Sequence, residues 1–272
     1  MCAPYVVEQV RLELSRRGFI GALTAGVAGT AVAELDAQPA RMAQGFRQVV
    51  DLTHPFSPQL PVYPVYKPIQ VRPRFAIGKD GFAANEVTFD EHTGTHVDAP
   101  AHFVAAGQTT DRIPARQLVV PLAVISIADR AAKNPDALVT VDDVLAWEKR
   151  HGRLPPGALV AMDAGWDVRT GSSERFLNAD AKGVMHTPGW SEEAARFLVG
   201  QRDISAVGVD TLSLDPGAAQ KFVAHLAILG AGKYGVELLA NLRGVPPSGA
   251  TVIIGAMKHQ GTGGPARVLA LL

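Results

Sequence analysis

The sequence predicts an α/β protein with a mixed β-sheet core and flanking helices. Continuous apolar runs at residues 118–127, 158–163 and 204–209 are typical of buried strands. Two segments that begin with capping residues, 141–150 and 191–201, lie between these runs and predict helices. The composition, with 47% hydrophobic and 19% charged residues, is that of a globular protein and excludes a disordered or fibrous one.

Local signals place the remaining elements in chain order. A β-branched run at residues 49–53 and the alternating residues 86–90 each predict a strand. Six prolines within residues 54–74 predict an extended loop rather than a helix. Thr140 and Ser191 are expected as the N-caps of the two helices. The C-terminal part adds short helix or strand segments at 222–229 and 236–242 and closing strands at 251–254 and 268–272.

The N-terminus predicts an export signal. Arg16 and Arg17 precede an apolar, glycine-rich run that ends in the small residues Ala31-Val32-Ala33, and this pattern resembles a twin-arginine signal. We therefore expect a signal peptide at 1–33, a linker at 34–48, one folded domain at 49–272 and a periplasmic location. The apolar run is too short to span a bilayer, so no stable membrane insertion is expected after cleavage.

Charge and cysteine content narrow the possible partners and ligands. Lysine plus arginine equal aspartate plus glutamate at 26 each, so no basic excess points to nucleic acid as a partner. Cys2 is the only cysteine, which excludes a disulfide within the chain. Any metal site must therefore use nitrogen and oxygen ligands.

The most informative segment is residues 92–102, which holds three histidines and one aspartate. In an extended backbone His96 and Asp98 point to the same face, and His92 shares that face if the strand continues. Gly94 permits a bulge or a close backbone approach, and Pro100 forces a turn that can bring His102 back over the site. Nitrogen and carboxylate ligands together suit zinc or manganese.

This segment, His-Thr-Gly-Thr-His-Val-Asp-Ala-Pro-Ala-His, resembles the signature of the cyclase-like metal hydrolases, which include bacterial kynurenine formamidase and isatin hydrolase. Further stretches resemble other motifs of that family: 51–55 with 61–64, Gly165-Trp166, 207–215, the pair His225 and Glu237, and 261–267. The resemblance covers most of the chain after residue 48. It implies the family's swivelling β/β/α type of fold within a single domain.

The resemblance also implies roles for individual residues. His92, His96 and Asp98 would bind one metal ion, and Asp98 would bridge to a second ion held by His225 and Glu237. Family members with a single manganese leave the count at one or two Zn²⁺ or Mn²⁺ ions. His102 would be the acid/base residue, with metal contact as an open alternative. Tyr63, Trp166 and Ser213 are candidates for contact with the substrate, and core packing is the alternative for the two aromatic residues.

The predicted function is metal-dependent hydrolysis of a C–N or C–O bond in an amide or lactone of a small aryl or cyclic substrate. Metal ions lower the pKa of bound water to about 7, and His102 can then shuttle a proton. The resemblance implies arylformamidase activity in tryptophan breakdown or, alternatively, ring opening of isatin or a dienelactone, and export favours ring opening. The alternative is a periplasmic metal- or ligand-binding protein without catalysis, which would have no need of His102. We further expect a homo-oligomer, a dimer or a tetramer.

Overall fold

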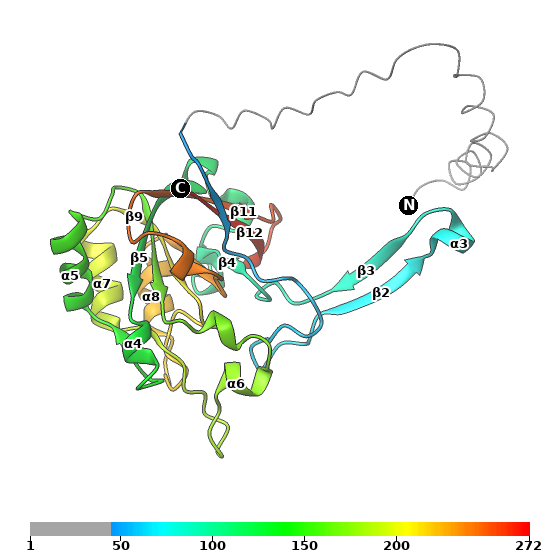
Figure 1. Cartoon of the computed structure of the whole chain (residues 1–272), viewed down its shortest axis with the longest axis horizontal. Helices are drawn as coiled ribbons and strands as arrows, with labels where there is room; N and C mark the ends of the chain where they lie inside the picture. Colours follow the sequence, from blue (N-terminus) through cyan, green and yellow to red (C-terminus); the bar gives the residue numbers. More distant parts are fainter. Residues whose placement is uncertain (1–44) are drawn as a thin grey trace, which may run out of the picture. The chain divides into compact units, whose positions relative to one another are not determined.

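The computed structural model describes residues 45–272, so the expected signal at 1–33 and most of the expected linker lie outside the described part. The described residues form two compact units, a hairpin of residues Gln70–Thr88 and a main unit that holds the rest. The main unit is an α/β fold built on one eight-stranded sheet (Figure 1). Its strands are β1 (Val49–Asp51), β4 (His96–Asp98), β5 (Val119–Ser126), β7 (Ala158–Asp163), β9 (Ile204–Val209), β10 (Tyr234–Glu237), β11 (Ala250–Ala256) and β12 (Gly263–Leu271).

The sheet is mixed, as the sequence predicts. β5, β7, β9 and β10 run parallel, and the pairs β10–β4, β12–β4, β11–β12, β11–β5 and β1–β12 are antiparallel. β4 pairs on both of its edges, with β10 and with β12, so the sheet closes upon itself. The middle of the chain also carries a short parallel pair, β6 (Leu138–Val139) and β8 (Gly189–Trp190).

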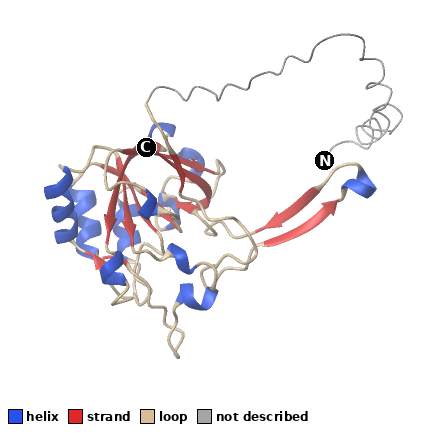
Figure 2. Cartoon of the chain, in the orientation of Figure 1, coloured by secondary structure: helices blue, strands red, loops and turns tan. Residues whose placement is uncertain are grey.

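Helices flank the sheet (Figure 2). They are α4 (Ala128–Ala131), α5 (Val141–His151), α6 (Ser173–Leu177), α7 (Glu192–Gln201) and α8 (Val223–Gly230), with 3₁₀ turns at Pro100–His102, Thr110–Arg112, Ala115–Gln117, Asp167–Arg169 and Leu242–Gly244. None of the helices within residues 45–272 is long and apolar enough to cross a membrane.

Helices α5 and α7 begin where the sequence predicts. Thr140 accepts a hydrogen bond from the Asp143 amide while the Asp143 side chain accepts one from the Thr140 amide, which completes a capping box. Ser191 caps α7 by accepting from the Ala194 amide. Their apolar faces, including Trp147 and Leu198, lie in one buried cluster with strand residues such as Val160. Satisfied helix ends and a shared core together fix these two helices.

The hairpin unit consists of β2 (Gln70–Phe75) and β3 (Ala84–Thr88), joined through the short helix α3 (Ile77–Asp80). The expected extended loop at 54–74 is therefore wrong from Gln70 onward. Pro73 is tolerated in β2 because the pairing register shifts between Pro73 and Phe75, and this irregularity bends the strand. The strand expected at 86–90 begins earlier, at Ala84, and ends at Thr88.

Candidate metal centre

Pairing of β4 with β10 brings the predicted ligands together from distant parts of the sequence. Glu237 lies directly opposite His96 in the register, so the two side chains share one face of the sheet. His96 Nε2 lies 3.2 Å from Asp98 Oδ1 and 3.4 Å from Glu237 Oε2. From α8, His225 Nε2 lies 3.1 Å from Glu237 Oε1 and 3.4 Å from Asp98 Oδ2. All four side chains are buried.

His92 reaches the same cluster by a route that strand periodicity does not predict. β4 begins only at His96, so the extended chain does not continue back to His92. Gly94 has a left-handed φ of +70°, and a Cβ there would lie 2.8 Å from the ring of Phe56. The turn at Gly94 instead places His92 Nδ1 2.5 Å from Asp98 Oδ1. The structure thus gathers all five predicted ligands, with Asp98 between the histidines.

Hydrogen bonds from behind orient two of the imidazole rings. His96 Nδ1 lies 2.7 Å from the Gly94 carbonyl oxygen, which can only accept, so Nδ1 carries the proton. His225 Nδ1 lies 2.6 Å from Asp215 Oδ2, and Asp215 also accepts from the amides of Ala224 and His225. With Nδ1 committed in both rings, each Nε2 faces the carboxylates and is the ring atom available to a metal ion. Asp215 is a functional residue that the sequence reasoning missed, although it lies in the stretch 207–215 singled out there.

The donor set fits a divalent metal ion. His96 Nε2 and Asp98 Oδ2 are buried without a hydrogen-bond partner, and an unsatisfied buried polar atom ordinarily costs about 1–3 kcal/mol. Two groups of ligand atoms lie within 4.8 Å of one another, His92 with His96 and Asp98, and Asp98 with His102 and His225. Imidazole nitrogens and carboxylate oxygens at this spacing match zinc or manganese sites, and a cation between them would partner the lone atoms.

The electrostatics of the cluster also favour a cation. Burial acts to lower the pKa of His96, but the charges of Asp98 and Glu237 outweigh it and raise that pKa to about 9. Burial acts to raise the pKa of Asp98, but the surrounding histidines hold it well below its ordinary value. Burial and the charge of Asp98 raise the pKa of Glu237. The two buried carboxylates therefore draw positive charge into the cluster.

His102 lies at the edge of the cluster, on the 3₁₀ turn Pro100–His102. Pro100 begins that turn, as the sequence predicts, and the His102 ring stacks on His92 with centroids 3.8 Å apart. Burial lowers the pKa of His102 to about 4, so its imidazole is neutral at pH 7 and able to accept a proton. Because one of its ring nitrogens also lies within 4.8 Å of ligand atoms of Asp98 and His225, the geometry is compatible with either ligation or proton transfer.

A cavity of about 350 Å³ opens onto the cluster. Of the three expected substrate contacts, Tyr63 and Ser213 line it, whereas Trp166 does not. Trp166 is buried in the core, and its indole N–H donates to the Phe176 carbonyl oxygen at 2.8 Å. The other lining residues are Val65, Tyr66, His92, His102, Phe103, Leu212, Phe222, His225 and Glu237.

Aromatic rings surround the histidines of this cavity. Phe103 stacks on His225 at 4.8 Å, Phe222 meets His225 edge-on at 5.7 Å, and Tyr66 stacks on His92 at 6.0 Å. None of these three residues is predicted from the sequence, because no motif includes them. The available signal is nearness in sequence, since Phe103 follows His102, Phe222 lies three residues before His225 and Tyr66 lies three residues after Tyr63. Together they make the walls apolar and flat around a polar floor.

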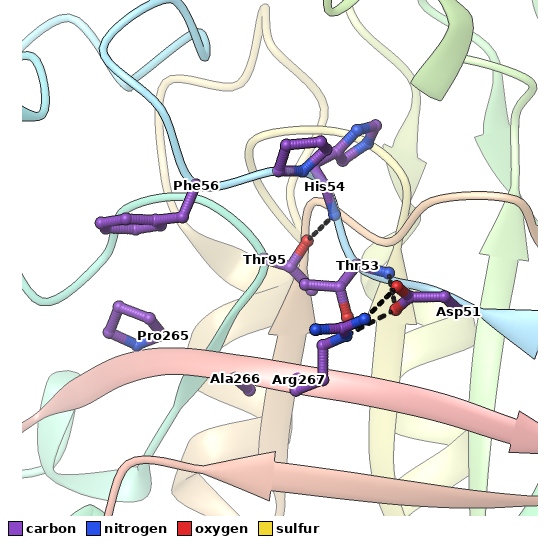
Figure 3. A pocket seen from close by; sticks show the side chains of 9 residues that line it. Asp51, Thr53, His54, Phe56, Thr95, Pro265, Ala266 and Arg267 are labelled. Atoms are coloured by element: carbon purple, nitrogen blue, oxygen red, sulfur yellow. Dashed lines mark hydrogen bonds and ion pairs between the residues drawn. The ribbon is translucent and has the colours of Figure 1, made fainter. Parts of the chain in front are cut away.

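A second cavity, of about 480 Å³, is lined by a different set of residues (Figure 3). Its one arginine, Arg267, is held by Asp51 through contacts of 3.0 and 2.7 Å. Thr95 at its wall accepts from the His54 amide at 3.0 Å and donates to the Leu238 carbonyl oxygen. None of the lining residues belongs to the His/Asp/Glu cluster. The chemistry therefore lies with the smaller cavity.

Comparison with known proteins identifies the family to which the chain is similar. The model of the family described as "Putative cyclase" matches residues 50–216. Isatin hydrolase of Roseibium aggregatum is 34% identical over 257 residues, which cover 86% of this chain and 95% of the relative. Kynurenine formamidase of Salinibacter ruber is 28% identical, with 82% of this chain and 96% of the relative covered.

Solved structures extend the likeness to the fold. Isatin hydrolase A from Labrenzia aggregata bound to benzyl benzoate superposes with a TM-score of 0.78 at 37% identity, covering 83% of this chain and 93% of that one. An isatin hydrolase bound to the product analogue thioisatinate superposes with a TM-score of 0.79 at 34% identity, covering 83% and 92%.

Proposed function

The chain belongs to the putative cyclase family and is a metal-dependent hydrolase acting on C–N bonds; from this premise we propose that it opens the ring of a small aromatic cyclic amide of the isatin type. The observation that carries the substrate class is the lining of the cavity. Tyr63, Tyr66, Phe103 and Phe222 offer flat apolar walls, and no lysine or arginine is among the lining residues. A neutral bicyclic lactam suits such a cavity.

One set of residues would bind the metal, and another would act on the substrate. His92, His96, Asp98, His225 and Glu237 would hold Zn²⁺ or Mn²⁺, as one ion or two. Such an ion, when bound, supplies activated water and polarises the carbonyl of the substrate. His102 would take the proton released during attack and return it to the leaving nitrogen, and the aromatic walls would keep the substrate ring flat over the metal centre. Ser213 lies at the same cavity and would hydrogen-bond a polar edge of the substrate.

Kynurenine formamidase activity is the second candidate, and the relatives at 28% identity or less support it. Its substrate, N-formylkynurenine, carries an amino-acid group with an ammonium and a carboxylate. Binding a carboxylate in a partly buried cavity ordinarily calls for arginine or lysine, which the lining residues do not include. The isatin type is therefore preferred.

The decisive experiment compares the two substrates on one preparation. Purified protein would be loaded with Mn²⁺ or with Zn²⁺ and assayed against isatin and N-formylkynurenine, with metal content measured in parallel. We expect kcat/KM for isatin to exceed that for N-formylkynurenine by at least tenfold. A preference of the same size for N-formylkynurenine would overturn the proposed substrate class. Full metal content without turnover of either substrate would favour the metal-binding protein considered in the sequence analysis.

We also propose export through the twin-arginine route, which rests on Arg16 and Arg17 before the apolar run. Replacing both arginines with lysine keeps the charge and should leave the precursor in the cytoplasm. Cell fractionation followed by detection of the protein measures this. Arrival of the double variant in the periplasm at the normal rate would rule the route out, and replacing Arg11 with lysine provides the control.

A homo-oligomer, dimer or tetramer, is proposed as well. The hairpin unit supports it, because a two-stranded hairpin is at best marginally stable alone. Five of its apolar side chains are exposed: Val71, Phe75, Ile77, Phe82 and Val87. Light scattering coupled to gel filtration measures the mass directly, and a monomer at micromolar concentration would contradict the proposal.

A further inference from the structure

A carboxylate and a hydroxyl lie directly behind His92, on the side away from Asp98. Glu91 Oε2 accepts from the amides of Thr262 at 2.9 Å and Gly263 at 3.3 Å, and from the Thr262 hydroxyl at 2.7 Å. His92 Nε2 lies 3.1 Å from the same hydroxyl oxygen. A short relay therefore runs from Glu91 through Thr262 to the imidazole.

The direction of each hydrogen bond in this relay follows from what the groups can donate. Backbone amides only donate, so Glu91 Oε2 is an acceptor and takes the single proton of the Thr262 hydroxyl. The Thr262 oxygen is then left with lone pairs and must accept from His92 Nε2. His92 consequently carries a proton on Nε2, which leaves Nδ1, 2.5 Å from Asp98 Oδ1, as its atom available to a metal ion.

We propose that Glu91 and Thr262 are positioning residues that fix the tautomer and ring orientation of His92, so that this ligand presents Nδ1 to the metal. The inference rests on the metal-dependent function proposed above and deepens it. His92 thereby differs from His96 and His225, whose Nδ1 protons are held from behind and whose Nε2 atoms face the carboxylates. Partners of this kind behind a ligand ordinarily strengthen metal binding 10–100-fold.

The backbone keeps the relay in place. Gly263 pairs with Asp98 in the β4–β12 register, and the Thr262 carbonyl accepts from the Ala99 amide at 2.9 Å. A Cβ on Gly263 would run into the His92 ring, so a glycine there lets the loop lie flat against the imidazole. Glu91 Oε1 is held from the other side by His259 Nε2 at 3.2 Å.

Metal affinity of the apo protein tests the proposal without any substrate. Thr262→Val keeps the shape of the side chain but removes the hydroxyl, and we expect the Kd for Mn²⁺ and Zn²⁺ to rise 10–100-fold. Thr262→Ser restores the hydroxyl and should recover an affinity within about threefold of the parent protein. Thr170→Val is the matched control, because the Thr170 hydroxyl donates to the Asp167 carbonyl oxygen, outside the cluster. Thermal unfolding of each apo variant separates loss of affinity from loss of fold.

Glu91→Ala provides a second variant should Thr262→Val fail to fold. It removes the carboxylate that accepts the Thr262 hydroxyl proton, so this proton can turn toward His92 Nε2 and favour the other tautomer. We expect an affinity loss of the same size, about 10–100-fold.

A direct readout is the ¹⁵N shift pattern of labelled histidines in the zinc-loaded protein. One ring, assigned to His92 by its absence from His92→Ala, should show zinc on Nδ1 and a proton on Nε2. Zinc on Nε2 of His92, or an unchanged Kd in folded Thr262→Val, would overturn the proposal. If the parent protein binds metal in this way but hydrolyses no lactam, the proposed function fails while this inference stands.

Discussion

Two regions of the main unit bury charge in opposite ways. On the helical side, Arg202 at the end of α7 pairs with Glu148 of α5 through two contacts of 2.7 Å, and their side chains are only 8% and 12% exposed. In the metal centre, Asp98 and Glu237 meet three imidazoles, with buried atoms left without partners. The first region satisfies its own charges, whereas the second leaves buried atoms that a cation would partner. The Arg202–Glu148 pair therefore serves folding, whereas the metal centre is arranged for chemistry.

The largest effect is expected at His102, the proposed acid/base residue. General acid–base help is typically worth about 10²–10⁴-fold in rate, so His102→Ala should lower kcat by that amount while keeping most of the metal. His102→Asn hydrogen-bonds but does not titrate, and should be nearly as poor. Turnover and metal content are measured on the same samples. Loss of metal together with activity would identify His102 as a ligand, and turnover at the parental rate would contradict the mechanism.

Removing a metal ligand should weaken metal binding directly and lower turnover only as a consequence. His96→Ala and Glu237→Ala each remove one ligand from a different strand. Loss of a hydrogen-bond partner behind a ligand can weaken metal binding by up to about 100-fold, so loss of the ligand itself should raise the metal Kd by at least that factor. Elemental analysis and competition with a chelator measure it. Arg267→Ala, at the other cavity, is the control and should bind metal normally. Full metal occupancy in both ligand variants would rule out the ligand set.

Features that neighbouring residues encode could be predicted from the sequence, whereas features that depend on the tertiary structure could not. Strands β7 and β9 have the bounds that the sequence predicts, because each coincides with a run of mostly apolar residues that are all buried. The candidate ligands could be named from the sequence because their residue types and spacing match a motif. The approach of His92 could not be predicted, since it depends on a left-handed turn at Gly94 that strand periodicity cannot express. Trp166 was misplaced because an aromatic side chain fits a core as well as a binding site.

Metal removal should destabilise the protein through the metal centre only, and not through the Arg202–Glu148 pair. A ligand present at 100 times its Kd stabilises the folded state by about 2.7 kcal/mol, so chelation should lower the free energy of unfolding by about that amount. Calorimetry with and without a chelator measures the shift in Tm. The same treatment of Glu237→Ala should produce little further change. An unchanged Tm of the parent protein would mean that the centre contributes nothing to folding through a bound ion.

The smallest effect on the free energy of unfolding is expected for the ion pair of Arg202 and Glu148. It should depend on pH rather than on metal. The hydrogen bond from Arg202 is the main cause that lowers the pKa of Glu148, and Glu148 also accepts from the Leu154 amide. A carboxyl whose pKa is lowered on folding stabilises the protein above its unfolded pKa, and this contribution is lost as the pH falls through the lower folded pKa.

Glu148→Gln should therefore lower the free energy of unfolding by about 1–2 kcal/mol at pH 7. The difference from the parent protein should shrink as the pH falls below the ordinary glutamate value of 4.5. Glu192→Gln breaks the exposed pair with Arg196 one helical turn away and should cost only about 0.3–0.5 kcal/mol. Urea unfolding at several pH values, repeated with chelator, measures both. Because Glu148 lies outside the metal centre, its effect should be the same with and without metal, and a metal-dependent effect would mean that the two regions are energetically coupled.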